Sequence, residues 1–416
     1  MGDGLNQTLW LFDPKKNSKI LKKILANANC DLARIYKMVT LILNMKPDEH
    51  EFKVMGMAPY GKKKYYLKIY KNIFKNIIKF KGLKIVENKR PKDLFIFLKE
   101  SLKYERFDNI AAACQYFLEK IVNELCFRIY KKYKIKNFYF GGGISMNVKM
   151  YKDLASKKYI NKIVNSPSGS DESLSLGACY YLNRNNNNKI VKDLYLGRKL
   201  IQDSKKLYEI AKSKFNKKDF KIINNVKSNY IAQLLKKDEI IAIANGREEF
   251  GARALGSRSI IANPSNFENI RKINEYIKSR DFWMPFALSI LDEEKNTLLL
   301  NVNSLNSSYM NLSFDTKKKY NEKIKAGCHP YDKTVRPQFV KKSQNINYYS
   351  IIKNFNKITK IPALLNTSLN LHGSPKCSDL LDVIYTFKNS GLNYLYLENN
   401  LLIKKIKIEQ LRKETS

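Results

Sequence analysis

Apolar residues recur at intervals of three and four in two stretches of the first half of the chain. The first stretch covers residues 31–44 and carries Leu32, Ile35, Val39 and Ile42. The second follows Asp108, a residue type that often caps a helix, and carries Ile110, Cys114, Phe117, Ile121, Leu125 and Ile129. This spacing puts the apolar side chains on one face, so both stretches are predicted to be helices with a buried side.

The region between these helices has a different composition. Residues 62–105 are rich in lysine, and their apolar positions include Tyr66, Ile69, Phe74 and Ile78. We predict a solvated amphipathic helix here and assign it no chemistry.

Short apolar runs that end in glycine or small polar residues predict strands. In the first half, residues 138–140 lead into three glycines at 141–143, and residues 163–165 lead into a Ser-Pro-Ser-Gly-Ser turn; a helix is expected after each turn. In the second half, residues 240–244 lead into Gly246 and residues 363–365 into 366–368. The end of the chain is expected to form a helix over 378–388 and strands over 394–396 and 401–403. Strands alternating with helices predict an α/β fold.

The length and one polar run divide the chain. A chain of 416 residues with 44% hydrophobic residues is long enough for two cores. Residues 183–189 are low in complexity and rich in asparagine, which is typical of a boundary. We therefore predict a first domain over 1–183, a linker over 184–193 and a second domain over 194–416.

The formal net charge of +39 could indicate a nucleic-acid partner. The lysines are spread along the whole chain rather than gathered in one block, and no nucleic-acid-binding module is present, so we do not expect such a partner. The six cysteines are far apart and no apolar run is long enough to cross a membrane. These features favour a reducing, cytoplasmic location and exclude a disulfide framework.

Arginine is concentrated in one stretch. Of the 77 basic residues only 13 are arginine, which leaves 64 lysines, yet residues 246–290 hold five arginines among three closely spaced glycines. The planar guanidinium binds phosphate or carboxylate with two parallel hydrogen bonds, which lysine cannot do. Because a strand is predicted just before Gly246, the stretch is expected at the end of a sheet strand, where open α/β sheets bind ligands. We interpret it as the wall of an anion-binding site.

The same stretch resembles the O-carbamoyltransferases of the nodulation-factor and antibiotic-tailoring type. The resemblance begins at Gly246, Arg247, Glu249, Phe250 and Gly251 and continues through Arg253-Ala254-Leu255-Gly256, Arg258-Ser259-Ile260, Asn274, Ile277-Lys278, Arg280-Asp281, Pro285-Phe286-Ala287, Arg336-Pro337-Gln338, Leu365-Asn366-Thr367-Ser368, Asn370, Gly373 and Pro375. Several linked motifs in order make this resemblance specific. It implies an incomplete actin/sugar-kinase-like first domain and a second, twisted-sheet domain similar to threonylcarbamoyl-adenylate synthases.

The resemblance also implies residue roles. Arg253, Lys278 and Arg336 are expected to contact phosphate and carbamate oxygens as the catalytic residues, and Asn366 and Ser368 to donate hydrogen bonds nearby. Arg280 is a further expected ligand for ATP or carbamoyl phosphate. For Arg247, Glu249 and Arg258 two interpretations stay open: contact with the ligand, or an ion-pair network that shapes the loop.

A metal site is implied in the first domain, with Asp3 and Asp171 as ligands. The family places a pair of histidines one helical turn apart before the position of Asp3, whereas this chain has only His50, His329 and His372. The chain is therefore expected to be N-terminally truncated relative to the family. Two carboxylates could hold Mg²⁺, and Fe²⁺ or another divalent metal would lack its histidine ligands.

A second departure lies in the arginine stretch. Met284 stands where many relatives have arginine, and methionine cannot bind an anion.

The expected function is an ATP-dependent O-carbamoyltransferase. It would use carbamoyl phosphate, form carbamoyl adenylate and carbamoylate a hydroxyl group of a sugar or natural-product acceptor. The alternative is an inactive remnant, or one half of a split protein that needs a partner chain for the missing segment. A homodimer is a further expectation.

Overall fold

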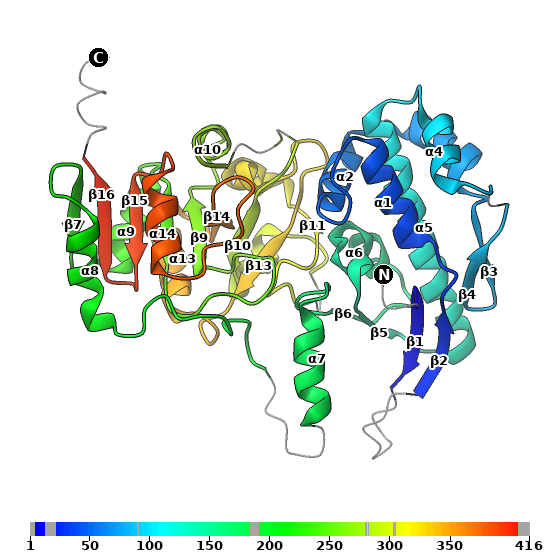
Figure 1. The fold of residues 1–416 in the computed structure, drawn as a ribbon, viewed down its shortest axis with the longest axis horizontal. Coiled ribbons are helices and arrows are strands. Elements are labelled where there is room, and N and C mark those ends of the chain that lie inside the picture. Colours follow the sequence, from blue (N-terminus) through cyan, green and yellow to red (C-terminus); the bar gives the residue numbers. More distant parts are fainter. Residues whose placement is uncertain are drawn as a thin grey trace. The chain divides into compact units, whose positions relative to one another are not determined.

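The structure is a computed structural model that describes residues 5–12, 22–89, 91–183, 191–278, 281, 283–302 and 305–406. The chain folds into two compact units, residues 1–174 and 175–416 (Figure 1). The described residues include no helix with the length and apolar character that crossing a bilayer requires.

The long helix α5 (Phe107–Tyr133) is the centre of the first unit. It packs against α1 (Leu32–Ile42), α2 (Glu51–Met57), α3 (Lys63–Ile69) and α6 (Val148–Ala155). The helices predicted over 31–44 and after Asp108 are thus present. The remaining elements are β1 (Gln7–Leu11), β2 (Lys22–Asn27), η1 (Ala58–Tyr60), η2 (Tyr70–Phe74), β3 (Ile78–Lys81), β4 (Lys84–Glu87), α4 (Leu94–Leu102), β5 (Asn137–Phe140), η3 (Gly143–Met146) and β6 (Lys162–Asn165).

Two predictions in this unit are wrong. Residues 62–105 are not one solvated helix, because Ile78 and Ile85 are buried in an antiparallel hairpin of β3 and β4 that turns at Gly82. Asp108 does not cap α5: the N-cap is Arg106, and the Asp108 carboxylate accepts from its guanidinium within the first turn.

Both predicted strand–turn–helix segments of the first unit are confirmed. Strands β5 and β6 pair in parallel, so the turns that follow them lie at one edge. Asn147 caps α6 by accepting from the Met150 N–H. Helix α7 (Ser173–Leu182) follows the second turn and contains the division between the two units.

The second unit is built on an eight-stranded mixed sheet in the order β13-β10-β14-β9-β8-β15-β16-β7. Its strands are β7 (Phe220–Ile223), β8 (Ile241–Ala244), β9 (Arg258–Ala262), β10 (Ala287–Leu291), β13 (Pro337–Val340), β14 (Ala363–Ser368), β15 (Tyr394–Leu397) and β16 (Leu401–Lys405). The central strands are buried along their length, as expected for a sheet covered on both faces. The prediction of an α/β fold is therefore confirmed at the level of a mixed fold with a large central sheet.

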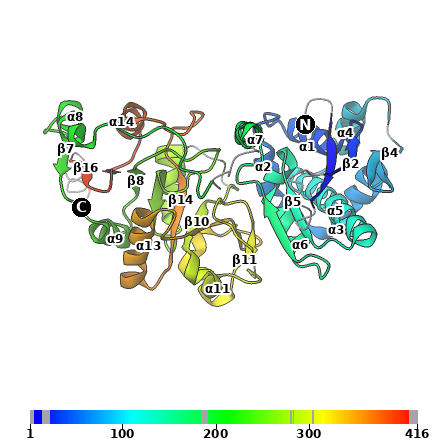
Figure 2. The same ribbon diagram turned by 90° about the horizontal axis from the view of Figure 1, so that it is seen from below.

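Helices cover both faces of this sheet. Figure 2 shows α8 (Leu207–Lys214) and α14 (Leu380–Lys388) across the sheet from α9 (Ser228–Lys236) and α13 (Ile346–Thr359). Smaller elements complete the unit: η4 (Ser204–Lys206), α10 (Glu268–Ile273), η5 (Asn274–Lys278), η6 (Asp292–Glu294), α11 (Lys295–Leu298), β11 (Phe314–Asp315), η7 (Lys318–Tyr320), α12 (Asn321–Ile324), η8 (Lys325–Gly327) and β12 (Thr334–Val335).

Candidate functional site

The strand registers bring most of the predicted ligand residues of the second unit to one edge of the large sheet. Ala244 at the end of β8 pairs with Arg258 at the start of β9, and Ser368 at the end of β14 pairs with Ser259. The starts of β10 and β13 lie at the same edge, because Ala287 pairs with Asn366 and Leu288 with Pro337. Arg247 and Arg253 in the β8–β9 loop and Arg336 before β13 therefore share this edge.

Lys278 is a buried cation of the predicted set. Its side chain is buried, and its ammonium donates to Ser368 Oγ at 3.2 Å, to the Asn370 carbonyl at 3.0 Å and to Asn370 Oδ1. It ends η5, a π-helical turn that continues α10. The structure thus joins Lys278 and Ser368, which are 90 residues apart in the chain. Such π-helical turns often occur at functional sites.

The helix leading to Lys278 buries only part of its apolar residues. Phe267, Ile270, Ile273 and Ile277 are spaced at intervals of three and four, which is typical of one helical face. Ile273 and Ile277 are buried, but Phe267 precedes the helix and is 51% exposed. Arg271 lies on the exposed side and pairs with Glu268 and Glu275, so it does not face Lys278.

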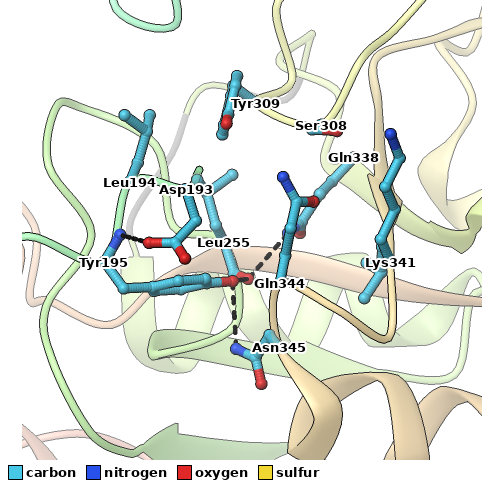
Figure 3. A pocket seen from close by; sticks show the side chains of 11 residues that line it. Asp193, Leu194, Tyr195, Leu255, Ser308, Tyr309, Gln338, Lys341, Gln344 and Asn345 are labelled. Atoms are coloured by element: carbon cyan, nitrogen blue, oxygen red, sulfur yellow. Dashed lines mark hydrogen bonds between the residues drawn. The ribbon is translucent and has the colours of Figure 1, made fainter. Parts of the chain in front are cut away.

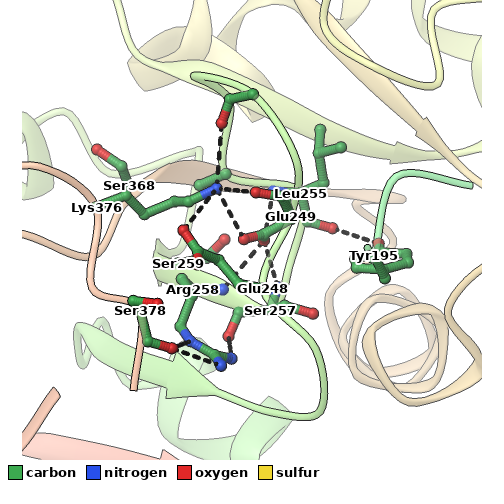
Figure 4. Close-up of polar contacts among 12 residues, drawn as sticks. Tyr195, Glu248, Glu249, Leu255, Ser257, Arg258, Ser259, Ser368, Lys376 and Ser378 are labelled. Atoms are coloured by element: carbon green, nitrogen blue, oxygen red, sulfur yellow. Dashed lines mark hydrogen bonds and ion pairs between the residues drawn. The ribbon is translucent and has the colours of Figure 1, made fainter. Parts of the chain in front are cut away.

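A buried carboxylate shapes the loop between β8 and β9 (Figure 4). Glu249 Oε1 accepts hydrogen bonds from the N–H groups of Leu255, Ser257 and Arg258 at 2.8, 2.7 and 3.0 Å. Its Oε2 lies 3.3 Å from the ammonium of Lys376. Burial alone would raise the pKa of this carboxyl, but Lys376 and the three N–H groups together hold the pKa below its usual value.

Arg258 binds the same loop from its buried side. It is fully buried, and its Nε, Nη1 and Nη2 donate to the carbonyls of Asn245, Gly246, Ser257 and Ser378 at 3.0 to 3.2 Å. Burial lowers the pKa of the guanidinium, and Glu249 opposes this shift. Of the two interpretations left open for Glu249 and Arg258, these contacts support the network that shapes the loop.

The other predicted residues take different positions. Arg247 is exposed and donates to the Leu196 carbonyl at 2.6 Å. Arg253 and Arg336 are partly exposed at the same edge. Asn366 is buried and donates to the Ala254 carbonyl at 3.1 Å and to Ser289 Oγ at 2.9 Å, so it supports the loop from the sheet side. Met284 is also buried. Arg280 lies outside the described residues.

A small pocket lies behind this loop (Figure 3). Tyr195 Oη donates to the Leu255 carbonyl at 2.9 Å, and Gln338 Nε2 donates to the same oxygen at 2.8 Å. The pocket has a volume of about 10 Å³, which is room for a single water molecule. Tyr195 and Gln338 thus support the loop at Leu255.

The predicted metal ligands are not assembled in the described part of the first unit. Asp171 is exposed at the turn before α7, and Asp3 lies outside the described residues. Within the described ranges, no three His, Cys, Asp or Glu side chains come close enough to form a metal site. Asp171 by itself does not fit a divalent metal, and the metal site stays a prediction.

Sequence reasoning missed Lys376. It contacts Glu249 from the loop that follows β14. Nothing in the sequence distinguishes it from the other lysines, because its partner lies 127 residues away along the chain.

Both halves of the chain match protein-family models. A family model described as the carbamoyltransferase N-terminus matches residues 1–180, and one described as the carbamoyltransferase C-terminus matches residues 232–405. Two uncharacterized proteins of Methanocaldococcus jannaschii are 33% and 30% identical over 98% and 90% of this chain. The chain spans 78% and 62% of their lengths.

A relative named nodulation protein NolO, from Bradyrhizobium diazoefficiens, is 28% identical over 85% of this chain and 66% of its own length. Among solved structures, HypF of T. kodakarensis matches 45% of this chain and 23% of its own, with a TM-score of 0.30 and 16% identity. YciO of E. coli matches 41% of this chain and 76% of its own, with a TM-score of 0.29 and 13% identity. Structural likenesses this weak carry no argument about function.

The two family models together cover most of the chain. The chain belongs to the carbamoyltransferase family.

Proposed function

We propose that this protein is an O-carbamoyltransferase that makes carbamoyl adenylate at the edge of the large sheet in its second unit. The substrates are carbamoyl phosphate and ATP with its Mg²⁺. The final acceptor is a hydroxyl group of a sugar or another natural product. Family membership supports carbamoyl transfer in general, and the finer steps are proposed from the site.

One observation carries the proposal. Residues from four separate segments, namely the β8–β9 loop, η5, the start of β13 and β14 with the loop after it, meet at one sheet edge, where Arg253, Lys278, Arg336 and Ser368 lie. Such an array of cations and hydroxyl groups, held in place by a prefolded loop, suits a ligand with several negative oxygens.

The chemistry follows from the charges involved. Water first releases phosphate from carbamoyl phosphate, which leaves carbamate. A carbamate oxygen then attacks the α-phosphorus of ATP, an O–P bond forms, and the bond to the β-phosphate breaks with departure of pyrophosphate. Negative charge accumulates on the phosphoryl oxygens during this step, and preplaced cations stabilise it without reorganising. Arg253, Lys278 and Arg336 are proposed for this role, and Ser368 and Asn370 fix the direction of the lysine ammonium.

Transfer to the acceptor completes the proposed reaction. The acceptor hydroxyl oxygen attacks the carbamoyl carbon, the bond from that carbon to the phosphate oxygen breaks, AMP leaves, and the hydroxyl proton passes to solvent. We place this step in the first unit, because a family model of its own matches it. Since Asp171 alone does not fit a metal, the transfer step is proposed without a metal ion bound in the first unit.

Mass spectrometry for carbamoyl adenylate tests the first half-reaction. The full chain is mixed with ATP, magnesium and carbamoyl phosphate, and the product is expected with wild type and reduced roughly 100-fold in Arg253→Ala. Arg271→Ala is the matched control, because this arginine forms only exposed ion pairs with Glu268 and Glu275. Product formation that is unchanged in Arg253→Ala would refute the proposed site, and no product with wild type would favour the inactive remnant.

A further inference from the structure

Lys376 connects the two loops that carry the proposed ligand residues. It lies in the loop after β14, and only 9% of its side chain is exposed. Its ammonium donates to the Glu249 carbonyl at 2.6 Å and to the Gly251 carbonyl at 3.3 Å. It also lies 3.3 Å from Glu249 Oε2 and 3.8 Å from Glu248 Oε1 (Figure 4). One buried cation is thus held by two carbonyls and two carboxylates of the opposite loop.

Each of these loops carries a different part of the proposed site. The β8–β9 loop carries Arg253, two residues after the carbonyl of Gly251 that Lys376 contacts. The loop after β14 begins beside Ser368 and Asn370, which hold the ammonium of Lys278. The distance between Arg253 and Lys278 is therefore set in part by the contact between Lys376 and the backbone at 249–251.

The Lys376 contact differs in kind from the contact that the Arg258 side chain makes with the loop after β14. Arg258 binds the Ser378 carbonyl, but it does so from the inner, fully buried side at the start of β9. Lys376 contacts the loop at its outer part, next to the turn that carries Arg253. Loss of Arg258 is expected to disrupt the sheet edge, whereas loss of Lys376 would release only the outer part of the loop.

We propose that Lys376 is a positioning residue for carbamoyl adenylate formation. It does not touch the substrate. It fixes the loop that presents Arg253 relative to the strand end that presents Lys278 and Ser368. This inference rests on the proposed function, because it assumes that these side chains act on one ligand. A misplacement of about 1 Å in such an array can reduce a rate on the order of 100-fold.

The test compares Lys376→Met and Lys376→Arg with wild type in the carbamoyl adenylate assay. Rates are measured per folded molecule, at a temperature below the unfolding midpoint of every variant. Lys376→Met is expected to lower kcat roughly 10- to 100-fold with a smaller change in KM for ATP, because alignment in the transition state is lost. Lys376→Arg is expected to recover most of kcat, since it retains a cation that can donate to both carbonyls. Lys342→Met, which removes an exposed lysine of the same unit, is expected to match wild type.

The double variant Lys376→Met with Glu249→Gln separates positioning from simple charge compensation. Lys376→Met leaves the Glu249 carboxylate buried without its cation, so this variant is expected to be less stable than wild type. The double variant removes that charge, so we expect its unfolding midpoint to rise again while kcat stays low, because the contacts to the 249 and 251 carbonyls remain lost. Recovery of both stability and kcat would show that Lys376 only neutralises Glu249.

Two further outcomes would contradict the inference in different ways. Wild-type kcat in Lys376→Met would overturn it and leave the proposed function standing. Failure of wild type to form carbamoyl adenylate would overturn the proposed function and the inference together.

Discussion

Glu249 and Arg258 are the two buried charges on which the shape of the β8–β9 loop depends. The Glu249 carboxylate accepts hydrogen bonds from the N–H groups of Leu255, Ser257 and Arg258. The Arg258 side chain in turn donates to the carbonyls of Asn245 and Gly246 at the start of the loop. Neither side chain is accessible to a ligand. The sequence identified both residues as important but could not distinguish binding from support, because that depends on which atoms they meet after folding.

Glu249→Gln tests the role of the carboxylate in stability. Because the pKa of Glu249 is lowered on folding, its contribution is present above the ordinary value of 4.5 and is lost as the pH falls through the lowered pKa. At neutral pH the variant is expected to lose about 3 kcal/mol of unfolding free energy. When unfolding in urea is measured at a series of pH values, the difference in unfolding free energy between the variant and wild type should shrink as the pH falls below 4.5. A difference that stays constant over this range would contradict the assigned cause.

Arg258→Lys tests whether the guanidinium shape matters. Lysine keeps the charge but offers one nitrogen, so it cannot reach the carbonyls of Asn245, Ser257 and Ser378 together. We expect a loss of roughly 2–4 kcal/mol in unfolding free energy, because several buried carbonyls lose a hydrogen-bond donor. Arg247→Lys, at an exposed position in the same loop, is the control and should change stability by less than about 0.5 kcal/mol. Equal effects in the two variants would argue against a specific role for Arg258.

At the scale of elements, the β8–β9 loop closes against helix α13. Gly256 has a φ of +104°, and a Cβ atom placed on it would lie 2.2 Å from Cδ1 of Tyr348, a buried residue of α13. Glycine is therefore required both for the backbone conformation and for the close approach of the helix. The loop, the helix and the sheet edge fix one another at this point.

Gly256→Ala is expected to destabilise the second unit by roughly 2–4 kcal/mol, since strain in φ adds to the collision with Tyr348. Gly373→Ala is the matched control: its φ is +73°, but nothing lies within 4 Å of the added atom. Gly373→Ala should lower the unfolding free energy by only about 1 kcal/mol, because it introduces backbone strain without a steric collision. Thermal unfolding of both variants measures the difference, and similar losses would show that the helix contact contributes little.

Most elements of the second unit could be predicted, whereas the lysine-rich part of the first could not. The runs before Gly246 and over 363–365 form strands because their side chains are apolar enough for a fully buried sheet. The prediction for residues 62–105 is wrong because Ile78 and Ile85 lie next to lysines in short strands, and so short a run fits the helical and the strand period equally well. The register of the sheet depends on contacts between residues that are far apart in the chain, and a local sequence pattern cannot predict them. The contact between Lys278 and Ser368 could therefore not be predicted from such a pattern.

At the scale of the whole molecule, the two family models match separate parts of the chain, one in each unit. The proposed activation step requires only residues of the second unit. The likeness of the first unit to actin and sugar kinases, and of the second to threonylcarbamoyl-adenylate synthases, stays a prediction. So does the role of Asp171, which is exposed.

The most direct test of the central claim is the formation of carbamoyl adenylate by the full chain from ATP, magnesium and carbamoyl phosphate, followed by mass spectrometry in wild type and Lys278→Met. Lys278 has been placed at the centre of the site by its contacts with Ser368 and Asn370. The account predicts product with wild type and a loss of at least about 100-fold in the variant, with folding retained by circular dichroism. Equal product from both proteins would contradict it.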